Sequence, residues 1–472
     1  MSSVNRMVKT TAIYFIGNFA SKLLTFILLP IYAAYLNPDS FGTVDLIIST
    51  LPLIAPVFTL QATESVFRFI CGEEIEQKIK SSITNALAIL IFGMTVFTVL
   101  YIPITTINKY SNSGLLYLYF IITYIGIFSQ QVARGVKKNK EYAVAGVLTT
   151  IIQAALNIIL IVSFEMQAES LLISASVASL AITIYLVYKS NMWRYINFKL
   201  IDKLELKSQL KYGIPLIPNQ ICWWANSAFC KYVLVYFWGS GDNGVFAFAS
   251  KFPNLIITVN SIFLLAFVEN LILEYKSPEC NEFFSKWFRL FSISQILLVA
   301  MLLPLTKIYN ILTISSTYST AALYIPILYV SSLFSSFAAM IGSIYTASMK
   351  TVYAFSTTLV SAGTNVILGL LLIPKFGIMG VCIANVISSI VFLLVRAVTI
   401  RKIMIIKYNL KEIYPTIVIL ICTLVWYYLF DLYYQMVPIL LVTAFVLIKY
   451  KNELNLVLDL FRKKLKNSDS KN

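Results

Sequence analysis

Long apolar runs separated by short polar segments extend along almost the whole chain. Runs of about 20 apolar residues are long enough to cross a bilayer as a helix, and they lack the period-two alternation of membrane barrel strands. A helix also satisfies its backbone amides without water. The pattern predicts an all-α membrane protein with about fourteen spans, at residues 11–36, 41–67, 81–107, 114–134, 141–164, 170–188, 212–238, 243–268, 288–312, 318–347, 351–373, 376–400, 412–430 and 434–449.

The composition indicates a polytopic membrane protein without a large soluble domain. Of the 472 residues, 59% are hydrophobic and only 12% are charged, whereas soluble proteins have about 25% charged residues. The chain has no histidine, and it lacks a phosphate-binding loop, a nucleophile motif and a cluster of acids with metal-ligand spacing. We therefore expect no catalytic residue, no metal and no cofactor.

The positive charges predict the orientation in the membrane. A formal net charge of +16 reflects basic cytoplasmic loops more simply than nucleic-acid binding. With a cytoplasmic N-terminus and alternating spans, 31 of the 37 basic residues lie on the cytoplasmic side. The six others are three in outer loops and three within spans, namely Lys109, Lys307 and Lys375, and Lys22, Lys231 and Lys251. Both termini are therefore expected in the cytoplasm.

The cytoplasmic linker at residues 189–211 has an amphipathic pattern. One helical face carries Trp193, Ile196, Leu200 and Leu204, while Lys199, Lys203 and Lys207 lie on the others. This pattern favours a helix that lies on the anionic inner leaflet, and a solvated basic linker is the alternative. The basic tail at residues 450–472 repeats the pattern and leaves the same two interpretations open.

An internal repeat divides the chain. Thr150, Gln153 and Asn157 share one helical face, and Thr358, Ser361 and Asn365 have the same spacing 208 positions later. The segments at residues 41–46 and 243–248 correspond with an offset of 202. Six spans per copy give both copies the same orientation, related by an axis along the membrane normal. We expect an N-terminal lobe at 1–188, the linker, a C-terminal lobe at 212–400, two extra spans within 401–449, and the tail.

Polar residues inside the first two spans of each copy predict a central cavity. A charge at the bilayer centre costs roughly 2.5–3.5 kcal/mol on insertion scales, so it is usually paired or faces water. The residues that we expect to line the cavity are Asn18, Lys22, Asp45, Lys231, Lys251 and Asn254, with Asn157 and Asn365 on the fifth span of each copy. The alternative is that these side chains only join helices.

The charged positions within the spans differ in what the pattern favours. Lys22 and Lys251 favour a functional interpretation, whereas Lys231 lies close enough to the outer surface to extend its side chain there. Glu64 and Arg68 have the spacing and the order of a helical ion pair near the inner end of the second span. For this pair a structural role is the better interpretation, and a part in ion coupling is the other one.

Several motifs, in their order, resemble those of a known transporter family. They run from Lys22 to Ile31, then Phe41-Gly42, Asp45 and Glu64-SVF-Arg68, and continue with Tyr212–Asn219, Trp223-Trp224, Gly244–Lys251 and Ile373–Val381. Together these residues resemble the Wzx-type oligosaccharide flippases of the multidrug/oligosaccharidyl-lipid/polysaccharide exporter superfamily. The chain departs from the family at Phe229-Cys230-Lys231, where relatives often have an adjacent acid and base and the acid is missing here.

The resemblance implies a two-lobed bundle of twelve to fourteen helices in the bacterial inner membrane. It also implies that an undecaprenyl-pyrophosphate-linked oligosaccharide is moved to the periplasmic leaflet for O-antigen or capsule assembly. The implied partners are that cargo, membrane lipids, a polysaccharide polymerase and a chain-length regulator. A cationic cavity suits a cargo that bears pyrophosphate.

Two other classes of function are weighed against this one. Another superfamily member would flip a cell-wall lipid precursor or export a drug-like cation, and the cationic cavity disfavours the latter. A membrane polysaccharide polymerase or glycosyltransferase would need a sizeable outer loop or a site rich in carboxylates. The predicted outer turns, such as Asn37–Ser40 and Gly239–Asp242, are too short for such a domain.

Overall fold

A computed structural model describes residues 26–450 except 109–112, 276, 314–315 and 408. Within these ranges every regular element is a helix and no strand occurs, so the predicted all-α fold is confirmed. Nine of the described helices are long and apolar enough to cross a membrane, and a shorter apolar helix follows them. Asn18, Lys22 and the tail after residue 450 lie outside the described residues.

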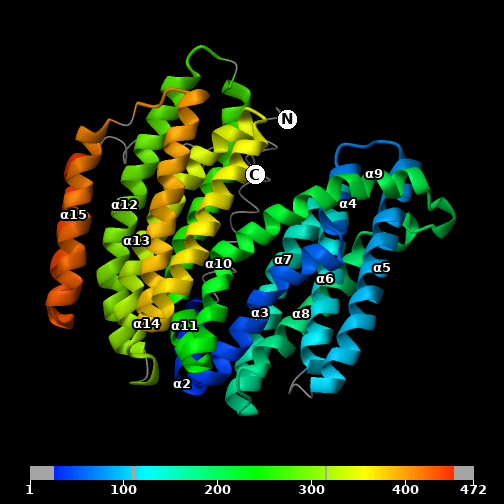
Figure 1. Ribbon diagram of the computed structural model, residues 1–472, viewed down its shortest axis with the longest axis horizontal. Helices are drawn as coiled ribbons and strands as arrows, with labels where there is room; N and C mark the ends of the chain where they lie inside the picture. Colours follow the sequence, from blue (N-terminus) through cyan, green and yellow to red (C-terminus); the bar gives the residue numbers. More distant parts are fainter. Residues whose placement is uncertain (1–25, 109–112, 276, 314–315, 408, 451–472) are drawn as a thin grey trace, which may run out of the picture. The chain divides into compact units, whose positions relative to one another are not determined.

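From residue 76 on, the first copy follows the predicted spans within a few residues, and Figure 1 shows its helices. They are α2 (Leu29–Tyr35), α3 (Pro38–Phe58), α4 (Ala62–Ile70), α5 (Glu76–Asn108), α6 (Ser113–Gly135), α7 (Asn139–Ile158) with a π turn η1 (Ile159–Ser163), and α8 (Glu169–Lys189).

The second copy and the helices after it are equally regular. They are α10 (Ile217–Trp238) after the short turn η4 (Ile214–Leu216), α11 (Ser240–Glu274), α12 (Cys280–Thr313), η5 (Ser316–Tyr318), α13 (Ala321–Ala347), α14 (Thr351–Thr399), η6 (Ile400–Lys402), α15 (Leu410–Leu429), η7 (Leu432–Gln435) and α16 (Met436–Lys449).

The chain divides into two compact units, which are described separately. The first contains Met1–Tyr275 and Ser315–Ile403, and the second contains Lys276–Ile314 and Met404–Asn472. In the second unit α12 packs against α15 and α16. This division differs from the predicted lobes, because it groups the ninth predicted span with the two extra spans.

The predicted span 41–67 is two helices. α3 ends at Phe58, and α4 begins at Ala62 after Leu60 and Gln61, whose φ angles of 48° and 57° are left-handed. Pro52 and Pro56 inside α3 each remove a backbone donor, which weakens the helix before the break. Two glycines fit closely around it: a Cβ atom on Gly93 would lie 1.6 Å from the Phe58 carbonyl oxygen, and one on Gly213 would lie 2.6 Å from that of Leu60.

Helix α14 contains two predicted spans joined at a kink. Its 49 residues would extend about 70 Å if straight, more than twice the hydrocarbon core of a bilayer. Gly377 breaks the helix with φ 54° and ψ −130°, three residues after Pro374. Trp238 packs on the glycine and donates from Nε1 to the Ile373 carbonyl oxygen at 2.8 Å. The kink thus separates the spans where the sequence placed their boundary.

The linker is not the single amphipathic helix that its pattern predicted. It consists of η2 (Met192–Tyr195), η3 (Phe198–Leu200) and α9 (Lys203–Gly213). Side chains at the start of α5 bind its backbone: Asn85 accepts from the Asp202 amide at 3.0 Å, and Thr84 accepts from the Asn197 amide at 3.0 Å. These hydrogen bonds compete with helical ones, so the periodicity of the side chains does not extend to the backbone.

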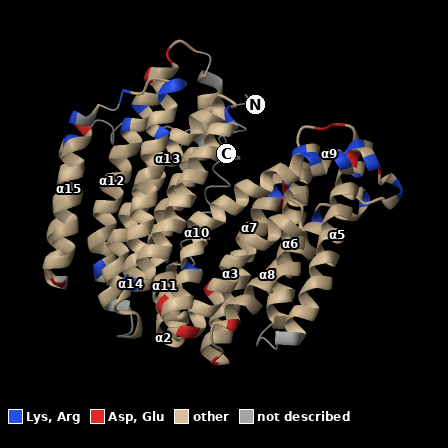
Figure 2. Cartoon of the chain, in the orientation of Figure 1, with Lys and Arg blue, Asp and Glu red and all other residues tan. Residues whose placement is uncertain are grey.

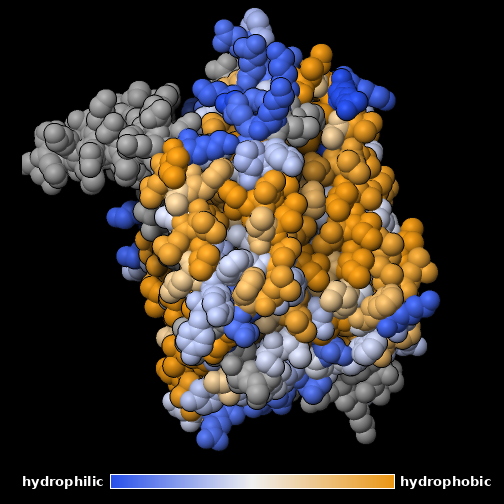
Figure 3. Space-filling view, turned by 90° about the vertical axis from the view of Figure 1, so that its left-hand side faces the viewer, coloured by the Kyte–Doolittle hydropathy of each residue, from blue (hydrophilic) through white to orange (hydrophobic). Residues whose placement is uncertain are grey.

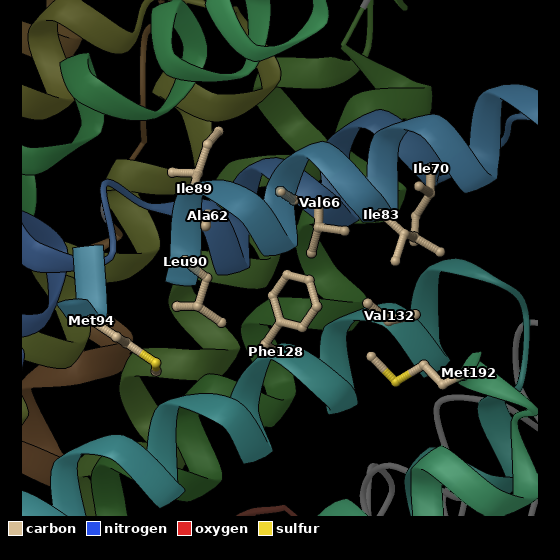
Figure 4. Packing of buried hydrophobic residues seen from close by; sticks show 11 residues of the cluster. Ala62, Val66, Ile70, Ile83, Ile89, Leu90, Met94, Phe128, Val132 and Met192 are labelled. Atoms are coloured by element: carbon tan, nitrogen blue, oxygen red, sulfur yellow. The ribbon is translucent and has the colours of Figure 1, made fainter. Parts of the chain in front are cut away.

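The core of the first copy lies where α4, α5 and α6 meet (Figure 4). The buried side chains come from all three helices, and Met192 of the linker closes the cluster: Ala62, Val66, Ile70, Ile83, Ala86, Ile89, Leu90, Met94, Phe128, Val132 and Met192. Burying each large apolar side chain stabilises the fold by about 1.5–3 kcal/mol. The linker is therefore anchored by packing as well as by hydrogen bonds.

Charged residues are confined mainly to helix ends. Figure 2 shows long tan stretches along the helices, with blue and red residues gathered near their termini. On the face drawn in Figure 3, hydrophobic side chains fill the middle and hydrophilic ones gather toward both ends. Many exposed residues are large and apolar, among them Phe92, Ile367 and Leu440. Such a surface suits a hydrocarbon surrounding and would be exceptional in water.

The close fit at Gly93 predicts a strong response to one added methyl group. Gly93→Ala should lower the stability of the purified protein by about 1–3 kcal/mol, because the new Cβ atom meets backbone that cannot rotate away. Gly146→Ala, inside α7 with open space around it, is the matched control and should be neutral or slightly stabilising. Thermal unfolding in detergent measures both, and equal melting temperatures would contradict the described packing.

Candidate functional site

The N-terminal ends of α3 and α11 cross in close contact. A Cβ atom on Gly42 would lie 1.9 Å from the carbonyl oxygen of Ser240, and one on Gly244 would lie 2.0 Å from that of Pro38. Gly42 and Gly244 are equivalent in the internal repeat, so each glycine accommodates the backbone of the other copy.

Hydrogen bonds reinforce this crossing. Asn243 donates from Nδ2 to the Gly42 carbonyl oxygen at 2.7 Å, and its side chain is fully buried. Ser240 donates from Oγ to Asp39 Oδ1 at 2.9 Å. Asp39 thus lies at the start of α11, where the helix presents unpaired amides and a partial positive charge.

An aromatic cluster packs beneath the crossing. Tyr318 is almost fully buried, lies edge-on to Phe41 at 6.3 Å between ring centroids, and packs on Phe248 at 4.9 Å. Its hydroxyl donates to the Leu36 carbonyl oxygen at 3.1 Å. Lys251 Nζ lies 5.7 Å from the centroid of the Phe41 ring. Lys251 of the second copy therefore points toward α3 of the first.

A largely buried ion pair joins the two copies. Lys231 Nζ of α10 lies 2.7 Å from Asp45 Oδ2 of α3 and donates to Ser49 Oγ at 2.9 Å. The side chains are only 14% and 12% exposed. The possible extension of Lys231 toward the outer surface is therefore wrong, because Asp45 and Ser49 hold the ammonium group inside. Position 230 is a cysteine, and the acid that pairs with Lys231 is Asp45 of the other copy.

Aromatic side chains of α10 continue this contact along α3. Trp224 donates from Nε1 to the Ser49 carbonyl oxygen at 2.9 Å, and Tyr232 shares a short hydrogen bond with Thr50. Trp224 and Tyr232 also contact each other edge-on, with ring centroids 5.6 Å apart. Six residues thus form what we call the interhelical cluster: Asp45, Ser49, Thr50, Trp224, Lys231 and Tyr232.

The positions of the charged residues along their helices give their distances from the helix ends. Asp45 follows Pro38 by seven residues, and Lys231 precedes Trp238 by seven. At 1.5 Å per residue the ion pair lies about 10 Å from these helix ends, and Lys251, eleven residues after Ser240, lies about 16 Å in. Lys251 therefore lies farther from the start of its helix than the ion pair lies from the helix ends beside it.

The two predicted asparagines hold helices together inside their own copies. Asn157 donates to the Tyr32 hydroxyl at 2.9 Å and accepts from Ser174, so it joins α2, α7 and α8. Asn365 donates to Asn385 Oδ1 at 2.9 Å and to Ser388 Oγ at 3.1 Å, both within α14.

Both asparagines are buried, and Asn365 also accepts from the Cys230 thiol of α10. They therefore occupy equivalent joining positions, while Asn254 on α11 is exposed. Through Cys230, Asn365 contacts the residue next to Lys231 of the interhelical cluster.

The predicted ion pair between Glu64 and Arg68 does not form, although the structure describes both residues. Glu64 Oε1 instead accepts from Gln131 Nε2 of α6 at 3.4 Å, while Arg68 is exposed. Glu64 lies in the first turn of α4, directly after the break, and this start turns it toward α6. The spacing that predicted the pair is therefore present, but its two members face different surroundings.

A buried arginine was missed by the sequence analysis, which assigned it to the cytoplasmic side. Arg396 of α14 is 5% exposed, and it donates from Nη1 to the Ala338 carbonyl oxygen at 2.6 Å and from Nε to Thr357 Oγ1 at 3.2 Å. Its guanidinium lies 4.0 Å from the centroid of the Phe392 ring. Gly342 makes room for it. Its position four residues before the span end concealed its burial.

No group of three His, Cys, Asp or Glu side chains in the described part of the chain is arranged to hold a metal ion. What the site offers is charge, hydrogen bonds and aromatic surface at the boundary between two repeats.

The sequence model of a family described as polysaccharide biosynthesis protein matches residues 7–268, more than half of the chain. The chain belongs to this family. The matched region includes all of α3, α4 and α10 and most of α11, and therefore the whole interhelical cluster. No curated protein is similar enough in sequence to count as a match.

Solved transporter structures share the fold. A lipid II flippase MurJ in an inward closed conformation is 17% identical, with a TM-score of 0.70, 94% of this chain and 100% of that chain being covered. An inward-facing multidrug resistance MATE family transporter of the MOP superfamily is 16% identical, with a TM-score of 0.63 and coverage of 81% and 95%.

An outward-facing MATE family transporter of the same superfamily is also 16% identical, with a TM-score of 0.58 and coverage of 84% and 95%. The protein thus has the fold of these transporters. This confirms the predicted fold class.

The buried ion pair predicts non-additive mutational effects. Asp45→Asn should destabilise the protein by about 3–5 kcal/mol, because it leaves the Lys231 charge buried without a partner. The double variant Asp45→Asn with Lys231→Gln should recover much of that loss. Thermal unfolding of the singles and the double gives the coupling energy.

A more exposed ion pair provides a matched control. Arg289 and Glu412 lie 2.9 Å apart in the other unit, with side chains 27% and 47% exposed. Arg289→Gln should cost no more than about 1 kcal/mol. Additive effects at Asp45 and Lys231, or equal costs at the two pairs, would show that the inner pair is solvated.

Proposed function

We propose that the protein is a flippase for an undecaprenyl-pyrophosphate-linked oligosaccharide, which it moves from the cytoplasmic to the periplasmic leaflet of a bacterial inner membrane for O-antigen or capsule assembly. The observation that carries this proposal is the placement of Lys231 and Lys251 on the helices where the two repeats meet, about 10 and 16 Å from the helix ends. Membership of a polysaccharide biosynthesis family supports it, and pyrophosphate is a ligand suited to lysines that are shielded from water.

In the proposed cycle, the crossing of α3 and α11 closes the periplasmic end. The distribution of basic residues supports this orientation, with both termini in the cytoplasm. Cargo enters from the cytoplasmic side while Gly42, Gly244 and the ion pair keep the other end shut. Release then requires the repeats to separate at this crossing, as alternating access between repeats demands.

The interhelical cluster links this opening to the cargo. Separation of α3 from α10 removes Asp45 from Lys231, and an ammonium group inside the membrane then needs another anion. The pyrophosphate of the cargo supplies it, with Lys251 as a second cation. We place Lys22, Asn18 and Asn254 along the same path, with aromatic and amide side chains toward the sugar.

Ion coupling is assigned to Asp45 in this proposal. Neutralisation of the Asp45 charge by the coupling ion would weaken its attraction to Lys231 and so favour the same opening. Glu64 contacts Gln131 within its own copy, which makes it the weaker candidate. A polysaccharide polymerase and a chain-length regulator are the partners that this function implies downstream.

A second candidate cargo is a cell-wall lipid precursor. The observation in its favour is the shared fold with a lipid II flippase over 94% of this chain. Expression in cells depleted of their own precursor flippase distinguishes the two, because survival would assign the precursor and continued lysis would leave the polysaccharide assignment in place.

Deletion of the gene should leave lipid-linked repeat units on the cytoplasmic leaflet. Without a flippase, the completed units have no route across the bilayer, since a charged headgroup does not cross hydrocarbon unaided. Labelling of accessible sugar in intact and in opened spheroplasts measures the side. Single repeat units accumulating on the periplasmic side would instead indicate a polymerase.

Lys251→Gln should reduce polymer display by roughly 10- to 100-fold without loss of protein, because a hydrogen bond to a charged group contributes about 1.5–3 kcal/mol. Lys22→Ala should act in the same direction. Lys350→Gln, at the exposed turn between α13 and α14, is the matched control and should leave display unchanged. Normal display from both the Lys251 and the Lys22 variants would overturn the assignment of the cavity.

A further inference from the structure

The linker presents large apolar side chains outward at one end of the first unit. Phe198 is 59% exposed and Leu204 is 74% exposed, and Trp193, Ile201 and Tyr188 are also exposed. Together with the exposed basic residues interleaved among them, these five form what we call the linker surface. The basic residues are Lys189, Arg194, Lys199, Lys203, Lys207 and Lys211.

The backbone of the linker is fixed, so these side chains cannot turn inward. Thr84 donates to the Tyr195 carbonyl oxygen at 3.3 Å, and Asn85 donates to that of Leu200 at 3.2 Å. Gln209 is fully buried and donates to the Ser82 carbonyl oxygen at 3.0 Å. Met192 is already part of the core of α4, α5 and α6. Because these contacts fix one face of the linker against α5 and the core, the apolar side chains of its other face remain exposed.

The positive charge of the linker surface is not neutralised within the linker. The two acids of the linker make hydrogen bonds to other groups. Asp202 accepts from the Glu205 amide at 3.1 Å and caps α9, and Glu205 accepts short hydrogen bonds from Ser81 and Ser82 of α5. Figure 2 shows blue residues gathered around α9, with some red ones among and beside them. Six cations thus surround apolar side chains at the level where α8 ends and α10 begins.

We propose that the linker surface binds the anionic phospholipid surface of the leaflet that borders this end of the helices. The aromatic and aliphatic side chains enter the boundary between headgroups and acyl chains, and the lysines contact the lipid phosphates. Basic residues around an apolar face are the composition that anionic bilayer surfaces bind. Because α9 ends at Gly213 against the break between α3 and α4, the bound leaflet holds the linker against the first copy.

A fluorescent label at position 204 tests this binding in the full-length protein. Leu204→Cys is made in a background with Cys71→Ser and Cys422→Ser, the two exposed cysteines in the described part of the chain. The labelled protein is reconstituted into phosphatidylcholine vesicles with and without phosphatidylglycerol, with no oligosaccharide present. Quenching by a nitroxide lipid reports membrane contact, and quenching by iodide reports contact with water.

We expect the nitroxide quenching to rise with phosphatidylglycerol and to fall again at high salt, which screens the attraction. Lys199→Gln, Lys203→Gln and Lys207→Gln together should shift the equilibrium away from the membrane by roughly 10-fold or more. The matched control removes three basic residues from the turn after α6 and the first turn of α7, by Lys137→Gln, Lys138→Gln and Lys140→Gln, and should retain the response.

Three results would overturn the proposal. The label remains quenched by iodide in both lipids, or it is shielded from both quenchers, as by a protein contact, or its nitroxide quenching does not depend on phosphatidylglycerol and on the three lysines. None of these readouts requires transport. Failure here therefore leaves the flippase proposal intact, and failure of the flippase assays leaves this one intact.

Discussion

The cost of a charge inside a bilayer is the constraint on which the site depends. Lys231 and Asp45 are each expensive in hydrocarbon, and they lie 2.7 Å apart because pairing is the least costly arrangement. Since one belongs to α3 and the other to α10, the same pairing fixes the two repeats against each other. The ion pair that makes both charges tolerable also joins the two copies. Any movement that separates α3 from α10 has to provide each charge with another partner.

Backbone packing sets the second constraint. Gly42 and Gly244 let two helix ends approach so closely that a Cβ atom on either glycine would collide with the backbone of the other helix. Gly93 and Gly213 allow the same close approach around the left-handed break after α3. Close approach of small residues supplies the packing that lipid-facing helices cannot gain from water. Close backbone contacts at these glycines therefore fix the crossing and the break.

Helix positions were predictable because a span must be apolar over its whole length, whereas contacts depend on rotation about the helix axis. The sequence thus placed α5 to α8 within a few residues and separated the two halves of α14 near Gly377. It could not show that Lys231 meets an acid 186 positions away, nor that Arg396 is buried. Glu64 and Arg68 had the right spacing, but a backbone break outside their own helix decided their surroundings.

The sharing of one ion pair between distant helices has a consequence for biosynthesis. Residue 45 leaves the ribosome long before residue 231. When α10 with Lys231 enters the membrane, α3 with Asp45, the counter-ion of Lys231, has therefore already been synthesised. The first repeat thereby acts as an assembly template for the second: α10 is easier to insert beside α3 than alone. In chains that lack Asp45, α10 would carry an unpaired Lys231 at the time of insertion. We expect such chains to be defective in assembly, before any cargo is transported.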